Sequence, residues 1–330
     1  MLRYLVVGLG NIGQRRKALL GERCVTTADP FNSAAEYRSV RDVPVDQFDA
    51  AVLAIPDADK VDLVTYLLEQ GKHILVEKPL PLPDEATARH LETLGQSKGL
   101  ALYTAYNHRF EPLLVAFKEQ MDAGVIGQVY HGRLFYGNGT VKHVAGTWRD
   151  HGLGAIQDLG CHLLDLLAFV GLAGVSPLPP TPSPGRGRGG DGSGLNMRLA
   201  SALSVETVAP DRAVIASADG RFMMEMMYHS WRNSFAFELF GHDGSIHCLG
   251  LRKWGGSELI VRKRVFPSGR PEETRWTDEG VDVTWELEVE HFERLCAQAA
   301  AGPVTNLATD WWIAQTLRSL EAALPPAPQH

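Results

Sequence analysis

The sequence predicts an α/β protein in two parts, a doubly wound parallel sheet at the N-terminus and then an α+β domain with a large, mostly antiparallel sheet. Three observations carry this prediction. Over the first hundred residues, short apolar runs alternate with amphipathic stretches. A GxGxxG turn follows the first apolar run, and many β-rich runs with intervening Asp-Gly pairs occupy the region after the middle of the chain.

The first part contains five apolar runs that we expect to be strands: 4–7, 24–27, 50–55, 74–77 and 100–104. Helical patterns lie between them at 12–20, 58–69 and 84–96. Strand–helix–strand alternation implies parallel strands joined by crossover helices. Both faces of such a sheet are covered, which accounts for uninterrupted apolar runs such as AVLAI.

The second part changes in kind after about residue 107. Helices are expected at 111–123, 153–170, 286–301 and 309–324. Strands are expected at 127–137, 198–205, 213–218, 222–228, 234–241, 245–251 and 258–263. Pairs such as Asp219-Gly220 and Asp243-Gly244 are hairpin signals, so this sheet should be largely antiparallel. We therefore predict a domain boundary near residue 112, between domains 1–112 and 113–330.

Composition excludes several classes of protein. Lys plus Arg is 32 and Asp plus Glu is 39, a net charge of -7, which argues against binding nucleic acid or an anionic membrane. Four isolated cysteines fit a reduced, cytoplasmic chain rather than a disulfide scaffold. No signal peptide is recognised, and the ten-residue apolar run at 166–175 is far shorter than the roughly 20 residues that span a bilayer.

The segment 174–194 has an unusual composition, because 12 of its 21 residues are Gly or Pro. Such a segment cannot bury apolar surface, so we predict a disordered, solvated insertion. An alternative is a basic lid over a substrate, carrying Arg186 and Arg188.

The GLGNIG segment at 8–13 follows a predicted strand and opens a predicted helix, which is the context of a Rossmann dinucleotide-binding turn. Gly8 would permit the tight turn, Gly10 would let the backbone approach a pyrophosphate, and Gly13 would allow close packing of helix and strand. The helix start at Asn11 and Ile12 would offer N–H groups to the phosphates.

An acidic residue, Asp29, ends the second predicted strand, 21 positions after Gly8. It would accept hydrogen bonds from the ribose hydroxyls of adenosine and repel a 2′-phosphate, so the sequence favours NAD over NADP. The alternative is a glycine-rich turn in an unrelated α/β protein.

Two further patterns suggest chemistry. Lys78, in Glu77-Lys78-Pro79, ends the fourth strand, where ligands of open parallel sheets bind; the alternative is a solvated lysine. Asp158, His162 and Asp165 have i, i+4, i+7 spacing on one helix face, which suits a general acid–base. A metal site and a structural histidine are the alternatives. We expect no metal, since no other His or Cys cluster has zinc spacing.

Together these motifs resemble the Gfo/Idh/MocA family, which includes glucose–fructose oxidoreductase and inositol 2-dehydrogenase. The resemblance rests on GLGNIG, AIPDADK (54–60), VEKPL (76–80), AYNHRFEP (105–112) and GAIQDLGCHLLDLL (154–167) and covers roughly residues 3 to 170. It implies an NAD(P)-dependent dehydrogenase that transfers a hydride between nicotinamide and a secondary hydroxyl of a sugar, sugar derivative or cyclitol.

The resemblance also implies roles for particular residues. Lys78 would contact the substrate hydroxyl and the nicotinamide ribose, His162 would accept the proton, and Asp158 would help to hold the substrate. The predicted cofactor contacts are Gly8, Gly10, Asn11, Ile12, Gly13, Asp29, Ile55, Pro56, Glu77 and Lys78. The predicted substrate contacts are Lys78, Asn107, Arg109, Trp148, Arg149, Asp158 and His162.

Two departures from the family pattern stand out. A histidine often found shortly after the third strand is missing, although Lys60 lies nearby, and the insertion at 174–194 is not a family feature. The resemblance further implies a homodimer or tetramer formed through a face of the C-terminal sheet. Two other functions stay open: a non-catalytic NAD-binding sensor, and a reductase of a non-sugar C=N or C=C substrate.

Overall fold

The computed structural model describes residues 1–147, 149–175, 194–302 and 304–325. Trp148 and most of the predicted insertion, residues 176–193, lie outside this range. The described chain divides into two compact units. The first comprises 1–106 and 285–314, and the second comprises 107–175, 194–284 and 315–325.

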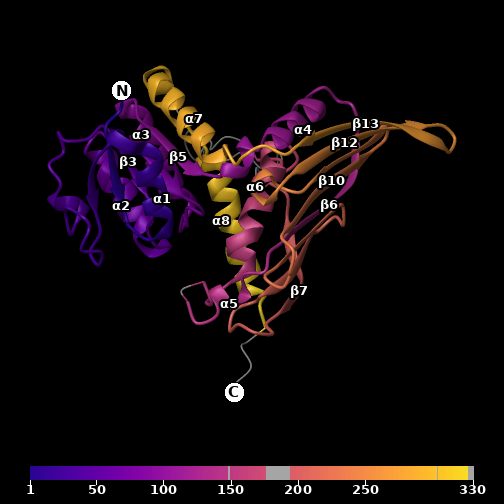
Figure 1. Ribbon diagram of the computed structural model, residues 1–330, viewed down its shortest axis with the longest axis horizontal. Coiled ribbons are helices and arrows are strands. Elements are labelled where there is room, and N and C mark those ends of the chain that lie inside the picture. Colours follow the sequence, from indigo (N-terminus) through magenta and orange to yellow (C-terminus); the bar gives the residue numbers. More distant parts are fainter. Residues whose placement is uncertain (148, 176–193, 303, 326–330) are drawn as a thin grey trace, which may run out of the picture. The chain divides into compact units, whose positions relative to one another are not determined.

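The first unit is built on a six-stranded sheet in which every pair is parallel (Figure 1). Its order is β14-β5-β4-β3-β1-β2. The strands are β1 (Tyr4–Val7), β2 (Cys24–Ala28), β3 (Ala50–Leu53), β4 (His73–Glu77), β5 (Ala101–Ala105) and β14 (Val304–Thr305). The helices are α1 (Asn11–Leu20), α2 (Asp57–Glu69), α3 (Glu85–Lys98) and α7 (Thr284–Gln298), with short 3₁₀ turns η1 (Gly21–Arg23), η2 (Val40–Asp42) and η6 (Ala299–Ala301).

Apolar runs become the core of this sheet. All four residues of β1 and of β3 are buried, as expected for strands covered on both faces. The same core includes Val64 and Leu67 of α2, and Leu307 from the start of α8 (Leu307–Ala322). Residues 285–314 therefore complete the first unit.

This return differs from the division that we predicted at residue 112. Two elements are responsible, α7 and β14; β14 is only two residues long, and in it Val304 pairs with Ala101 and Thr305 with Leu102. A two-residue strand carries no periodic signal, so the sequence could not show that the chain comes back to β5.

The second unit contains an eight-stranded sheet in the order β13-β12-β11-β10-β6-β9-β8-β7. All of its pairs are antiparallel except β6 with β9. The strands are β6 (Val129–Gly137), β7 (Met197–Leu203), β8 (Arg212–Ser217), β9 (Phe222–Met227), β10 (Ser234–Gly241), β11 (Gly244–Leu249), β12 (Ser257–Val265) and β13 (Gly269–Asp278). The other elements are η3 (Asn107–Phe110), α4 (Pro112–Asp122), α5 (Val141–Val144), η4 (Ile156–Gly160), α6 (Cys161–Phe169), η5 (Arg252–Trp254) and the end of α8.

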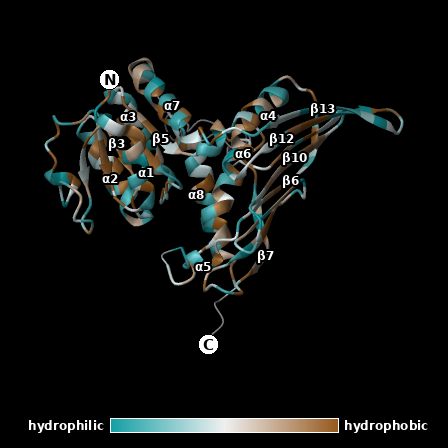
Figure 2. Cartoon of the chain, viewed as in Figure 1, coloured by the Kyte–Doolittle hydropathy of each residue, from teal (hydrophilic) through white to brown (hydrophobic). Residues whose placement is uncertain are grey.

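The predicted fold class, a parallel Rossmann sheet followed by a mostly antiparallel sheet, is confirmed. Two local expectations were wrong. The sequence analysis missed β13 because its residues, GRPEETRWTD, are exposed along nearly the whole strand and show no apolar alternation (Figure 2). The regular helix expected at 153–170 instead contains a π-helical turn, η4, before α6. In the part of the chain described by the structure, no helix is both long and apolar enough to cross a membrane.

Candidate functional site

The glycine turn, residues 8–13, connects β1 to α1 in the first unit. Gly8 has φ +82°, and a Cβ there would lie 2.4 Å from the carbonyl oxygen of Ala54. A Cβ on Gly13 would lie only 1.7 Å from the carbonyl oxygen of Gly8. The fold itself therefore requires glycine at both positions.

Gly10 is different. A Cβ at this position would meet no atom within 4 Å among the described residues. Gly10 is also the N-cap of α1, where no described side chain caps the helix and no acidic residue occupies the first turn. The helix thus begins at Asn11 with N–H groups and a partial positive charge beside open space, which fits a dinucleotide phosphate.

Asp29 holds the glycine turn in place. Its Oδ2 accepts a hydrogen bond from the backbone N–H of Leu9 at 2.6 Å, and its Oδ1 accepts from Phe31 and Asn32 at 2.8 Å each. Burial alone would raise the pKa of Asp29, but these three backbone donors outweigh it and lower the pKa. The carboxylate is therefore ionised and fixed at the end of β2, where an adenosine ribose is expected.

The strand that ends in Lys78 is anchored by a buried charge network. Arg16 on α1 donates from Nε to Glu77 Oε1 at 2.8 Å and from Nη2 to Glu288 Oε2 on α7 at 2.6 Å. Arg16 and Glu288 are both essentially inaccessible to solvent. Burial would lower the pKa of Arg16, but the two carboxylates outweigh it and raise the pKa. Arg16 of α1 therefore fixes the side chain of Glu77, the last residue of β4.

The backbone around Lys78 is held by a second lysine. Lys60 Nζ donates to the carbonyl oxygens of Lys78 at 3.2 Å and of Pro79 at 2.8 Å, and it pairs with Asp57 at 2.6 Å. Burial lowers the pKa of Lys60, although Asp57 opposes this shift. Lys60, which the sequence analysis had noted without a role, thus connects the first turn of α2 to the Lys78 loop.

The remaining two predicted cofactor residues lie at the start of α2. Pro56 is the N-cap residue of that helix. The Cγ2 atom of Ile55 lies 3.0 Å from the position that a Cβ on Gly8 would occupy, so Ile55 borders the glycine turn. Ile55 and the glycine turn are thus neighbours within the first unit.

His162 lies on α6 in the second unit and is only 7% exposed. Its ring stacks on that of His108, with centroids 4.1 Å apart and planes tilted by 32°. We call these two residues the histidine pair. Tyr136 on β6 lies beside both rings, 5.4 Å from His108 and 6.0 Å from His162 between centroids. The sequence analysis named Asn107 and Arg109 but passed over His108 between them.

Asp158 lies in the π-helical turn η4, one turn before His162. It accepts a hydrogen bond from the hydroxyl of Tyr228 at 3.3 Å. Burial, followed by the charge of Asp158, raises the pKa of Tyr228, whereas the positive charge of Arg149 opposes the shift. Asp158, Arg149 and Tyr228 therefore share one electrostatic neighbourhood. A π-helical turn often marks a functional site.

The third member of the predicted stripe, Asp165, has a different partner. Arg109 donates from Nε to Asp165 Oδ2 at 2.8 Å and from Nη2 to Oδ1 at 2.5 Å. Burial raises the pKa of Asp165, and Arg109 counters it. This ion pair connects η3 to α6 and so fixes the two elements that carry the histidine pair. The predicted contact of Arg109 with substrate stays a prediction.

The predicted site residues thus fall into two groups. Lys78 and the cofactor residues belong to the first unit, whereas Asn107, Arg109, Arg149, Asp158 and His162 belong to the second. Among the described residues, no group of three or more His, Cys, Asp or Glu side chains is placed to hold a metal ion.

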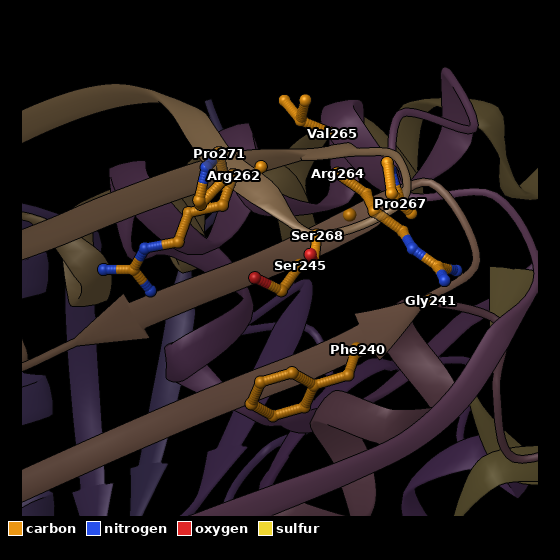
Figure 3. Close-up of a pocket in the computed structure, with 11 residues that line it drawn as sticks. Phe240, Gly241, Ser245, Arg262, Arg264, Val265, Pro267, Ser268 and Pro271 are labelled. Carbon is orange, nitrogen blue, oxygen red and sulfur yellow. The ribbon is translucent and has the colours of Figure 1, made fainter.

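A shallow hollow of about 320 Å³ lies elsewhere in the second unit, beside the turn between β12 and β13 (Figure 3). Arg262 and Arg264 line it together with Phe240 and Ser245. Arg262 pairs with Glu273 at 2.7 Å, and Arg264 donates to the carbonyl oxygen of His242 at 3.1 Å. No predicted site residue lines this hollow, so we do not include it in the candidate site.

The parallel sheet with its fitted glycine turn defines a nucleotide-binding unit of the kind that NAD(P)-dependent oxidoreductases use. Comparison with known proteins also indicates an NAD-binding unit. Residues 2–106 match the model of the GFO_IDH_MocA family, described as "Oxidoreductase family, NAD-binding Rossmann fold". Residues 2–106 are therefore similar to the NAD-binding Rossmann part of the Gfo/Idh/MocA family.

Two relatives and one solved structure illustrate the similarity. Inositol 2-dehydrogenase of Rhizobium meliloti is 29% identical over 194 residues, which are 54% of this chain and 57% of that protein. The scyllo-inositol 2-dehydrogenase (NAD(+)) of Bacillus subtilis is 27% identical over 173 residues, which are 45% of this chain and 50% of that protein. The matches thus span only about half of either relative's length.

A solved structure extends the likeness in fold to nearly the whole chain. Levoglucosan dehydrogenase in complex with NADH superposes with a TM-score of 0.73, covering 98% of this chain and 97% of that one, at 18% identity. The match shows that both units have the fold of this enzyme.

Proposed function

We propose that the protein is an NAD-dependent dehydrogenase that transfers a hydride between nicotinamide and a secondary hydroxyl of a sugar, sugar derivative or cyclitol. The observation that carries the proposal is the chain's combination of an NAD-binding glycine turn with a buried imidazole, His162, on a helix that begins at Asp158's π-helical turn. The relatives named as inositol and levoglucosan dehydrogenases support a polyhydroxylated substrate.

Each proposed residue has a separate task. Gly10 and the start of α1 would hold the pyrophosphate, and Asp29 would hold the adenosine ribose and so favour NAD over NADP. When bound, NAD would accept the hydride on its nicotinamide ring. His162 takes the hydroxyl proton as general base and returns it in the reverse direction. The ammonium of Lys78 stabilises the negative charge that develops on the substrate oxygen.

Two charged residues of the second unit would contact the substrate. Asp158 and Arg149 carry charges near one another and near Tyr228, so they would select the polar groups of the substrate. We also propose a cytoplasmic homodimer or tetramer, from the cysteine usage and the family resemblance.

A substrate panel tests the function. Purified protein is mixed with NAD or NADP and with free sugars, sugar acids, nucleotide sugars and inositols, and formation of the reduced cofactor is followed. We expect oxidation of at least one polyol with NAD. Lys78→Ala and His162→Ala should each lower kcat about 100-fold or more while NAD still binds.

The controls separate this function from the alternatives. Lys142→Ala and His143→Ala, on the short helix α5, should leave turnover unchanged. Tight NAD binding without oxidation of any polyol would contradict the proposal and favour a sensor. Full activity in both Lys78→Ala and His162→Ala would show that the assigned acid–base residues are wrong.

A further inference from the structure

His108 belongs to a series of side chains in the second unit that no sequence motif announces. Five hydrogen bonds connect six residues. They join Lys253 Nζ to Tyr136 Oη at 3.0 Å, Tyr136 Oη to His108 Nε2 at 3.2 Å, His108 Nδ1 to Asn107 Oδ1 at 3.0 Å, Asn107 Nδ2 to Thr284 Oγ1 at 2.9 Å, and Thr284 Oγ1 to Asp282 Oδ1 at 2.7 Å. We call this series the Lys253–Asp282 relay.

The chemistry of its two ends constrains the direction of these hydrogen bonds. An ammonium can only donate, so Tyr136 Oη accepts from Lys253 and has its own proton left for His108 Nε2. When Tyr136 donates in this way, His108 Nε2 is the acceptor, and the neutral ring carries its proton on Nδ1, where it is donated to Asn107.

The other end gives the same answer independently. The carboxylate of Asp282 accepts from the hydroxyl of Thr284, which leaves the Thr284 oxygen to accept from the amide of Asn107. The carbonyl oxygen of Asn107 therefore faces His108 and accepts its Nδ1–H. The Asp282 end therefore requires a proton on Nδ1 of His108, and the Lys253 end leaves the proton of Tyr136 available to a neutral Nε2.

We infer that the Lys253–Asp282 relay keeps His108 neutral and Nδ1-protonated, and that His108 in this form is a positioning residue for His162. The inference rests on the proposed function, in which His162 accepts the substrate proton. The two ring centroids are 4.1 Å apart, so a charge on one imidazole would act directly on the other.

The charge of His108 matters because His162 must gain a proton. A neutral ring presents its π face to the imidazolium and stabilises it. A protonated His108 would place a like charge on the stacked ring and oppose proton uptake by His162. Among the described residues, the titratable and charged groups near His108 include His162 on α6, Arg109 beside it on η3 with its partner Asp165, Glu111 just after η3, Tyr136 on β6, and Lys253 on η5 through Tyr136.

Nitrogen chemical shifts of labelled histidine test the tautomer without any substrate. Spectra of His108→Gln and His162→Gln assign the two signals among the 12 histidines. In the unaltered protein, His108 should stay neutral with its proton on Nδ1 while exposed histidines titrate. In Tyr136→Phe and Lys253→Met, His108 should take up a proton at higher pH. Lys253→Arg, which keeps the charge, should restore the original behaviour.

Kinetics on a substrate from the panel test the consequence. Tyr136→Phe and Lys253→Met should lower kcat about tenfold with little change in KM, a fraction of what loss of the general base would remove. The acidic side of the kcat/KM profile should become steeper, because two coupled imidazoles then titrate. Tyr130→Phe, an exposed tyrosine of the same strand, is the matched control.

The outcomes separate this inference from the proposed function. If His108 titrates like an exposed histidine in the unaltered protein, or stays neutral in every variant, the relay has no such role. If Tyr136→Phe does not fold, the Lys253→Met and Lys253→Arg pair gives the same decision. If His162→Ala leaves turnover intact, the proposed function fails, while the chemical shifts still decide the state of His108.

Discussion

The glycine turn of the first unit and the histidine pair of the second unit are built in opposite ways. The glycine turn is a run of six consecutive residues, 8–13, whose geometry is set by the backbone. The histidine pair is assembled from η3 and α6 and held by side chains that extend to Asp282. The first can be read from one stretch of sequence, whereas the second exists only after the chain has folded.

Two buried titratable side chains, one in each unit, are accommodated in different ways. In the first unit, Arg16 lies between two carboxylates, so that ionised groups balance one another. In the second unit, Glu111 is only 3% exposed and accepts a hydrogen bond from the backbone N–H of Arg252 at 3.3 Å. Its pKa rises to about 7 because burial disfavours the charged form. Arg16 is thus kept charged by its partners, whereas the charged form of Glu111 is disfavoured.

The strongest test of the glycine turn is Gly13→Ala. Its Cβ would meet the carbonyl oxygen of Gly8 at 1.7 Å, so we expect too large a distortion for folded protein to accumulate. Gly10→Ala is the matched control, because its Cβ meets open space. That variant should stay within about 1 kcal/mol of the original stability but lose NAD affinity. Urea unfolding and NAD titration measure both, and a well-folded Gly13→Ala protein would contradict this account.

The next largest effect is expected from Arg16→Met, which removes the charge between Glu77 and Glu288. Glu288 would then be buried, and Glu77 half-buried, without this cation, so we expect a loss of about 3 to 5 kcal/mol in the free energy of unfolding. Both Arg15 and Arg16 lie over the Trp285 ring, with their Cζ atoms 4.2 Å and 4.1 Å from its centroid. Arg15→Met is therefore the control: Arg15 is exposed, so only about 0.5 to 1 kcal/mol should be lost. Equal losses in both variants would show that Trp285, not the carboxylates, holds Arg16.

Most of the fold followed from the sequence because its signals are local. The apolar runs at β1 and β3 form fully buried strands, and the alternating pattern of β10 gives a strand with the predicted bounds. What the sequence could not supply was non-local. The two-residue strand β14 is defined only by its partner β5, and β13 only by its pairing with β12.

The candidate site divides in the same way. Gly8, Gly10 and Gly13 were assigned distinct tasks from spacing, and the space around each position agrees with the task. Tyr136 and Lys253 were missed, since a tyrosine in a strand and a lysine in a turn carry no pattern that indicates a relay. His108 had a signal, its position in the family-like AYNHRFEP run, but its stacking on His162 depends on the packing of η3 and α6.

Glu111, a buried carboxyl of the second unit, should make the free energy of unfolding depend on pH. The folded-state pKa of Glu111, about 7, is above its ordinary value of 4.5, so folded protein holds a proton that unfolded protein releases. This contribution to stability is complete below pH 4.5 and is lost as the pH rises to about 7, a change of about 3 kcal/mol. Glu111→Gln should remove that part of the dependence, and Glu119→Gln, on an exposed position of α4, should not. Urea unfolding across this pH window gives the answer, and parallel curves for Glu111→Gln and the unaltered protein would contradict the assignment.

The smallest expected effect concerns cofactor choice. It depends on Asp29, a side chain that both supports the glycine turn and is proposed to bind the cofactor. Its carboxylate fixes Leu9 inside the glycine turn and also stands where an adenosine ribose is expected. Asp29→Ala should therefore raise the KM for NAD roughly tenfold, the value of about one hydrogen bond to a charged group. The KM for NADP should change less, because loss of the turn's support and loss of repulsion toward the 2′-phosphate act in opposite directions. Phe31→Ala, at a neighbouring side chain that is 93% exposed, is the control and should leave both constants unchanged. If the unaltered protein already prefers NADP, Asp29 only supports the backbone of the glycine turn and does not select NAD.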